Sequence, residues 1–169
     1  LERLLYIITG QDDAQIREWF TSLAETGRYE VNDAVNKVLS EEFFGGYCDD
    51  EQTKATIHEI YEKYSYTCDT HTAVAVKVYE DYKKATGDTT KTIIASTASP
   101  YKFSASVLEA IEGKKSDLDE YAMVDRLAEL SNIPVPAALA DLKNKERRFT
   151  GSIEKSDMNS FVLKDFGLA

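Results

Sequence analysis

The residues whose types could do chemistry at neutral pH are few in this sequence, which has two histidines and two cysteines. His71 follows Asp69 by two positions, and an imidazole there could position a phosphate or a water near a substrate. In the other interpretation, Asp69 caps a helix that begins here and His71 packs against its first turn. Cys48 and Cys68 lack the spacing of a zinc site or a disulfide framework, so we expect ordinary buried thiols and no metal.

Composition and motifs exclude several classes of function. The 20 Lys and Arg residues stand against 30 Asp and Glu residues, and the net charge of -10 would repel a phosphate backbone. We therefore expect no nucleic-acid partner. No apolar run approaches the ~20 residues that span a bilayer, so we also expect no membrane partner and a cytoplasmic location. The sequence contains no P-loop, no nucleophile elbow and no metal-spaced set of His and Cys.

Apolar residues at helical spacing occur along most of the chain and predict the elements that must position any site. The first predicted helix begins at Leu1 and ends before Gly10, and the second runs from Asp12 to before Gly27. A shorter third helix begins at Asn32. The remaining predicted helices cover residues 49–64, 71–85, 104–111, 117–130, 137–143 and 156–163. The chain begins without Met, a leader or a capping residue, from which we expect that an upstream part is missing.

Residues 92–96, Thr-Ile-Ile-Ala-Ser, form the clearest strand candidate. They are short, apolar and rich in β-branched side chains, with turn-forming residues on both sides, which is typical of a buried strand in a parallel sheet. Many helices with one or two strands are an unusual ratio for a complete α/β domain. The ratio fits a part of a larger sheet, and it fits a wholly helical domain as well.

Two motifs resemble a late part of threonine synthases. Residues 93–103, Ile-Ile-Ala-Ser-Thr-Ala-Ser-Pro-Tyr-Lys-Phe, resemble a segment in which an apolar strand leads into Ser-Thr-Ala-x-Pro-x-Lys-Phe. Residues 69–74, Asp-Thr-His-Thr-Ala-Val, resemble the family's Asp-Pro-His-Thr-Ala-Val. Thr70 replaces the proline, which frees a backbone dihedral and adds an N–H that could loosen the turn before His71.

The resemblance extends beyond these two motifs. Residues 1–5 look like the helix that follows a Ser-Asn pair in the family, and residues 46–51, Gly-Tyr-Cys-Asp-Asp-Glu, fit the family's next loop. The similarity thus covers residues 1–111, and after Gly113 it depends on helix order alone.

The resemblance implies an α/β fold in which residues 1–169 are a single unit. This unit would be the helix-rich C-terminal part of the large domain of a type II pyridoxal-phosphate enzyme, with one or two parallel strands. The intact enzyme, a carbon–oxygen lyase acting on phosphates, would convert O-phosphohomoserine and water to threonine and phosphate in threonine biosynthesis. Its missing N-terminal portion would carry the Schiff-base lysine and the phosphate-binding loop, so we expect this chain alone to be inactive.

Thr97 is the cofactor-binding residue that the resemblance implies, because in this fold a hydroxyl near the end of a late strand bonds the pyridine nitrogen of pyridoxal phosphate. The alternative is that Thr97 caps the helix that begins near Ser104 or bonds its own backbone. His71 is the candidate catalytic residue. Lys102 is not the counterpart of the Schiff-base lysine, and we expect it to form an ion pair.

A different class of function stays open from the sequence. The chain could be a free-standing, mostly helical interaction module that is related to threonine synthase and has lost catalysis. Such a module would need an exposed apolar or acidic docking surface of its own.

Overall fold

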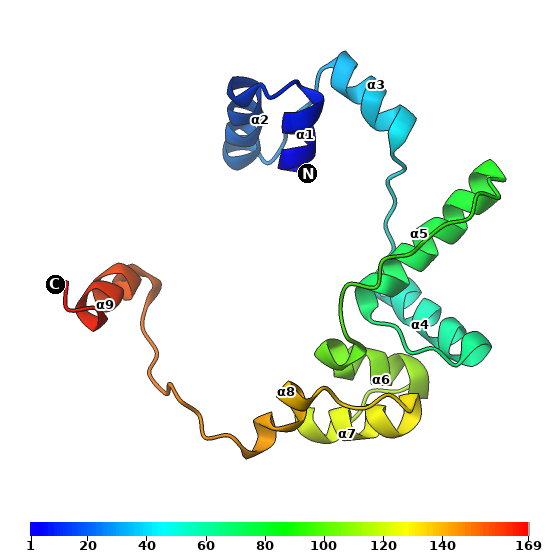
Figure 1. Cartoon of the computed structure of the whole chain (residues 1–169), viewed down its shortest axis with the longest axis vertical. Helices are drawn as coiled ribbons and strands as arrows, with labels where there is room; N and C mark the ends of the chain where they lie inside the picture. The colour runs from blue at the N-terminus through cyan, green and yellow to red at the C-terminus, as the bar shows by residue number, and fades with distance from the viewer. Residues whose placement is uncertain (169) are drawn as a thin grey trace.

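The computed structural model describes residues 1–168, in which all regular elements are helices (Figure 1); Ala169, the last residue of the predicted 1–169 unit, lies outside the described part. The helices that apolar spacing predicts are confirmed, with small shifts at their ends. The α-helices are α1 (Glu2–Ile8), α2 (Asp13–Thr26), α3 (Asp33–Glu42), α4 (Asp50–Tyr64), α5 (Thr70–Thr86), α6 (Ser104–Glu112), α7 (Glu120–Ser131), α8 (Ala137–Ala140) and α9 (Met158–Asp165). Three short 3₁₀ helices join them: η1 (Pro100–Phe103), η2 (Leu142–Asn144) and η3 (Lys155–Asp157).

Short polar side chains set where the helices begin. Asp12 accepts a hydrogen bond from the backbone N of Gln15, and Asn32 accepts one from the backbone N of Val35. Such acceptors satisfy amides that have no partner inside the first helical turn. The same arrangement starts α4, α5 and α7, where the capping residues are Asp49, Asp69 and Asp119.

The structure corrects the prediction of a parallel strand. None of residues 1–168 forms a strand, and residues 92–96 follow an irregular path between α5 and η1. A strand needs a neighbour that accepts and donates its backbone hydrogen bonds, and no second extended segment pairs with these residues in the described part of the chain. The apolar pattern therefore has nothing to pack against at Ile93, which is 94% exposed.

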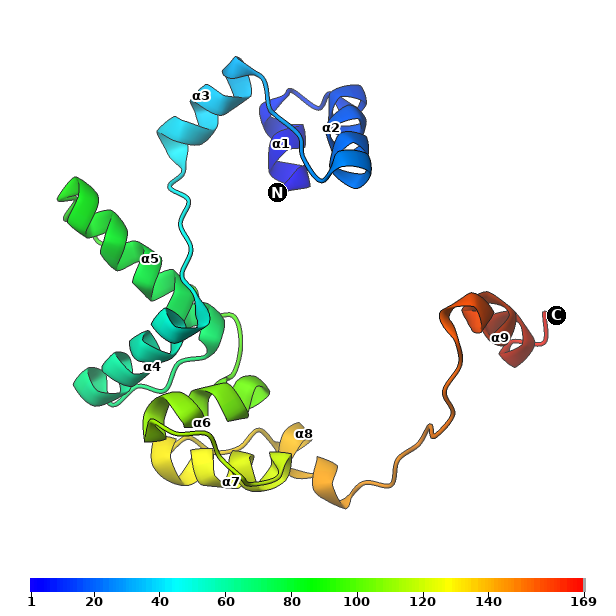
Figure 2. The same cartoon turned by 180° about the vertical axis from the view of Figure 1, so that it is seen from behind.

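Within residues 1–168, two separate hydrophobic cores hold the helices α1–α3 and α4–α7 together. The smaller core lies among α1–α3 and contains Leu5, Ile16, Trp19 and Val35. The larger core lies among α4–α7 and is formed by Ile57, Ile60, Cys68, Ala73, Tyr101, Val107, Ala110, Val124 and Leu127. Figures 1 and 2 show that the two groups of helices lie apart and that α9 stands at the end of a long linker.

The linker of residues 43–49 joins the two groups and runs along α5. The Phe44 ring meets the Tyr82 ring edge-on, with 5.1 Å between the ring centroids. Gly46 passes so close to Val78 that a Cβ at this glycine would lie 2.7 Å from Val78 Cγ1. Contacts with α5 therefore hold the linker against the larger group of helices.

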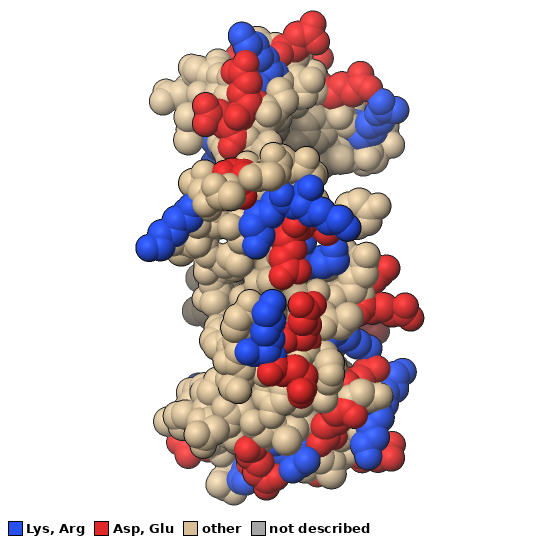
Figure 3. Space-filling model, turned by 90° about the vertical axis from the view of Figure 1, so that its right-hand side faces the viewer, with Lys and Arg blue, Asp and Glu red and all other residues tan. Residues whose placement is uncertain are grey.

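The surface carries mixed charge. On the face in Figure 3, Lys and Arg side chains are interspersed with Asp and Glu, so neither sign forms a continuous patch there. Among residues 1–168, no helix combines the length and the apolar character needed to cross a bilayer.

Candidate functional site

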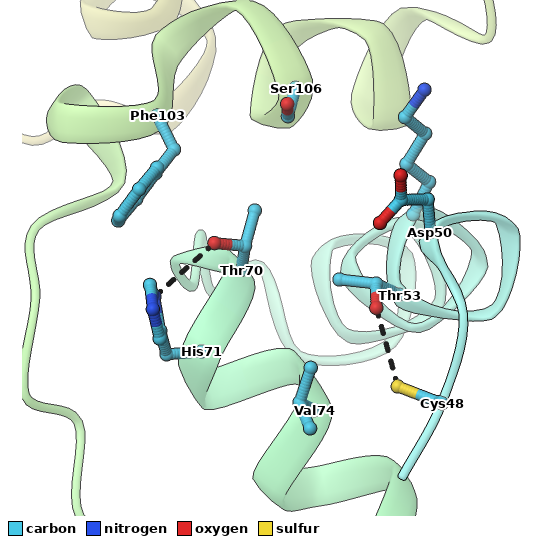
Figure 4. A pocket seen from close by; sticks show the side chains of 9 residues that line it. Cys48, Asp50, Thr53, Thr70, His71, Val74, Phe103 and Ser106 are labelled. Carbon is cyan, nitrogen blue, oxygen red and sulfur yellow. Dashed lines mark hydrogen bonds between the residues drawn. The ribbon is translucent and has the colours of Figure 1, made fainter. Parts of the chain in front are cut away.

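A cavity of about 390 Å³ lies where the first turn of α5 faces α4 and α6. His71 and Phe103 form one side of it, while Cys48 and Thr53 lie opposite (Figure 4). The remaining lining residues are Asp50, Lys54, Thr70, Val74 and Ser106. The cavity is thus walled by hydroxyl groups, one thiol, one imidazole and two charged side chains.

The start of α5 is organised by Asp69, whose side chain is fully buried. Its Oδ1 accepts hydrogen bonds from the backbone N of His71 at 2.9 Å and of Thr72 at 3.4 Å, and its Oδ2 accepts one from the Thr72 hydroxyl. The positive end of the helix dipole stabilises the buried negative charge at this position. The interpretation of Asp69 as a helix cap is confirmed.

One ring nitrogen of His71 lies near polar side chains, and the other has no hydrogen-bond partner within residues 1–168. Its Nδ1 lies 3.4 Å from Asp69 Oδ1 and 3.4 Å from Thr70 Oγ1, and its ring centroid lies 5.0 Å from that of Phe103. No hydrogen bond within residues 1–168 engages Nε2, and 66% of the side chain is exposed. A neutral ring with its proton on Nδ1, facing the carboxylate, presents Nε2 as a hydrogen-bond acceptor.

The wall opposite His71 consists of residues that the sequence did not assign to a site, and Cys48 in this wall is half-buried rather than buried as expected. Cys48 Sγ lies 3.3 Å from Thr53 Oγ1, whose hydroxyl donates to the backbone oxygen of Asp49 at 2.7 Å. Lys54 Nζ lies 2.9 Å from Glu109 Oε1, so its charge is compensated by a carboxylate of α6. The one available signal was the loop motif of residues 46–51, which contains Cys48 but gives no indication that α4 packs beside α5.

The described structure shows no hydrogen bond to the Thr97 side chain, which is exposed. Ser99, not Thr97, caps η1 by accepting from the backbone N of Tyr101 at 3.4 Å, and α6 begins without a side-chain cap. The alternative in which Thr97 caps the helix near Ser104 is therefore wrong. Thr97 is also absent from the lining of the cavity beside His71, so this cavity does not bring the two predicted site residues together.

The ion pair predicted for Lys102 is absent from residues 1–168. Its Nζ lies 5.5 Å from the centroid of the Phe103 ring, and it forms no ion pair with any residue in the range 1–168. A cation over an aromatic face replaces the expected salt bridge.

Comparison with known proteins identifies relatives along nearly the whole chain. Residues 72–161 match the family described as threonine synthase, C-terminal. Human threonine synthase-like 1 is 27% identical over 165 residues, which cover 97% of this chain and 22% of that protein. Threonine synthase from Methylobacillus glycogenes is 31% identical over 115 residues, or 67% of this chain and 24% of that protein.

Two solved structures resemble the arrangement of the helices. Threonine synthase from yeast aligns with a TM-score of 0.68 and 23% identity, covering 99% of this chain and 34% of that one. Pyridoxal-phosphate-bound threonine synthase from Brucella melitensis aligns with a TM-score of 0.61 and 26% identity, covering 88% of this chain and 27% of that one. The chain thus spans between a fifth and about a third of the proteins that it resembles.

Proposed function

The chain belongs to the threonine synthase family, and on that premise we propose that residues 1–169 serve as one unit of an intact threonine synthase. The unit is the C-terminal part of the large domain, and it contributes Thr97 to the pyridoxal-phosphate site. The observation that carries this proposal is the Thr97 hydroxyl, which is exposed and has no hydrogen-bond partner within residues 1–168 although it lies in the family's motif.

The residues present fit a part of a pyridoxal-phosphate site. Thr97 offers a free neutral hydroxyl to the pyridine nitrogen. The loop that contains Gly45 and Gly46 leads instead into Asp49 and Asp50, and an acidic helix start is a poor cradle for a phosphate. The Schiff-base lysine and the phosphate-binding loop therefore come from the rest of the intact enzyme.

The reaction of the intact enzyme is the conversion of O-phosphohomoserine and water to threonine and phosphate, in the cytoplasm. Bound pyridoxal phosphate supplies an electron sink. A hydroxyl at the pyridine nitrogen leaves the ring less fully protonated than a carboxylate would, which suits elimination and replacement chemistry. His71, which lines the cavity and whose Nε2 has no hydrogen-bond partner within residues 1–168, positions a phosphate oxygen or a water.

The test is Thr97→Ala in the complete enzyme. A hydrogen bond to a charged or strongly polarised group is worth about 1.5–3 kcal/mol, so kcat should fall about 10- to 100-fold. The absorption band of the bound cofactor should shift as well, while the far-ultraviolet circular dichroism spectrum, which reports secondary structure, stays unchanged. Thr97→Ser should restore most of the activity, and Thr92→Ala, which removes an exposed hydroxyl that bonds only its own loop, is the matched control. Full activity and an unshifted band in Thr97→Ala would remove Thr97 from the site.

A second candidate is a non-catalytic interaction module, for which α9 is the specific observation. The apolar side chains Met158, Phe161 and Val162 of α9 and Phe166 at its C-cap are between 45% and 74% exposed, and α9 contributes no residue to either hydrophobic core of residues 1–168. Relatives named threonine synthase-like, rather than threonine synthase, also exist. The mass of the native polypeptide discriminates the two, because this chain covers only 24% and 34% of the threonine synthases from Methylobacillus glycogenes and yeast, whereas a module can match this chain in mass.

A further inference from the structure

The buried carboxylate of Asp69 does more than cap α5. Its Oδ1 takes the backbone amides of the first turn, which is what a helix cap requires, but its Oδ2 is engaged by the Thr72 hydroxyl. Both oxygens of this fully buried carboxylate thus accept hydrogen bonds, and Oδ2 accepts one from the Thr72 side chain rather than from a backbone amide.

Thr72 connects this carboxylate to the loop that contains Thr97. Thr72 Oγ1 lies 3.1 Å from Ser96 Oγ, and the Tyr66 hydroxyl lies 3.4 Å from the same Ser96 oxygen. The Thr72 hydroxyl is the donor in both of its contacts and shares its one proton between Asp69 Oδ2 and Ser96 Oγ. Ser96 Oγ also accepts from the Tyr66 hydroxyl. A chain of hydrogen bonds thus links Asp69 through Thr72 to Ser96.

These hydrogen bonds are the main polar contacts that hold residues 93–98 in place. Within residues 1–168, every hydrogen bond that ties residues 93–98 to another part of the structure ends on the Ser96 hydroxyl. Thr97 follows Ser96 directly in the chain, so a Ser96 held against the first turn of α5 restricts where the exposed Thr97 side chain can lie.

We propose that Asp69, Thr72 and Ser96 position Thr97, so that the first turn of α5 fixes the direction in which the Thr97 hydroxyl points. The positioning is a property of this chain and needs no cofactor. Its role in catalysis rests on the proposed function, in which Thr97 contacts pyridoxal phosphate.

The test uses backbone ¹⁵N relaxation on this 169-residue chain. Thr72→Val keeps the shape of the side chain and the amide bonds to Asp69 but removes the hydroxyl. We expect the order parameters of residues 96–98 to fall from about 0.85, the value of rigid backbone, to below about 0.6. Thr72→Ser, which keeps the hydroxyl, should leave them unchanged. Thr56→Val is the matched control, because Thr56 is also buried and its hydroxyl bonds only Gln52 within α4.

A second variant covers the case in which Thr72→Val disturbs the fold by leaving Asp69 Oδ2 without its partner. Ser96→Ala breaks the same chain at its exposed end, and residues 96–98 should loosen to the same extent. Order parameters that stay high in Ser96→Ala would overturn the proposal. The outcome is separable from that of the proposed function: in the complete enzyme, a cofactor absorption band insensitive to Thr97→Ala would refute the cofactor role of Thr97, while the loosening of residues 96–98 would still support the positioning.

Discussion

Truncation of one leucine in each core tests whether the two cores fold independently. Leu127 and Leu5 are both completely buried, the first in the core of α4–α7 and the second in the core of α1–α3. Leu127→Ala and Leu5→Ala make the same chemical change, so each variant is the matched control of the other.

The expected magnitude follows from the burial of these side chains. A Leu→Ala change at a fully buried position costs about 2–5 kcal/mol, as lost transfer free energy plus the cavity left behind. A loss of about 3 kcal/mol multiplies the equilibrium population of the open state by ~150, since every 1.4 kcal/mol is a factor of ten. For α1–α3 the consequence is larger in relative terms, because Leu5 is one of only four buried residues in that core. We therefore expect Leu5→Ala to abolish stable packing of α1–α3.

Amide hydrogen exchange resolved by segment measures both effects. In Leu127→Ala, the amides of α4, α6 and α7 should exchange about 100-fold faster while those of α1–α3 keep their rates, because opening of one unit does not open the other. Leu5→Ala should deprotect α1–α3 and leave α4–α7 unchanged. If either variant accelerates exchange equally in both groups, the two cores form one cooperative unit and the reasoning from their separation fails.

Two further predictions concern the linker and the cysteines. Gly46→Ala should overpack against Val78 and loosen the linker from α5, at a cost of about 1–3 kcal/mol in stability. Amide hydrogen exchange at the end of α3 should become faster as a result. Gly45→Ala is the control because a Cβ there meets nothing within 4 Å, and equal effects of the two variants would contradict the contact. Burial raises the pKa of the Cys68 thiol to about 11, and the charge of Asp69 adds to the rise. Iodoacetamide at pH 8 should alkylate the partly exposed Cys48 and spare Cys68. The alkylation rate of Cys68 should rise about 100-fold between pH 8 and pH 10. Peptide mass spectrometry measures both rates, and equal alkylation rates at pH 8 would refute this prediction.

Local signals in the sequence were sufficient for the helices and their starts. Asp49 precedes Gln52 by three residues, and the two form a capping box in the structure. Gly27 and Gly87 end their helices in the left-handed conformation that glycine adopts without strain. Each of these features depends on residues within one helical turn, so the sequence contains all that is needed to predict it.

Features that depend on distant partners could not be predicted in this way. Residues 92–96 have the composition of a strand, but pairing requires a second strand that the described residues do not provide. The cavity beside His71 depends on how α4 packs against α5 and α6, which the apolar periodicity of α4 does not specify. Asp69 was predictable as a cap, whereas its link to Ser96 spans 24 residues between Thr72 and Ser96 and exists only once the loop folds back onto α5.

The placement of the three parts of the chain points to the larger fold of the family. The helices α1–α3 and the helices α4–α8 have separate cores, and α9 belongs to neither of them. Yet 99% of the chain aligns with yeast threonine synthase at a TM-score of 0.68, in a protein of which it covers 34%. This agreement with part of a longer protein supports the proposal that the chain acts within an intact threonine synthase, in which the exposed apolar side chains of α9 and Ile93 would be buried.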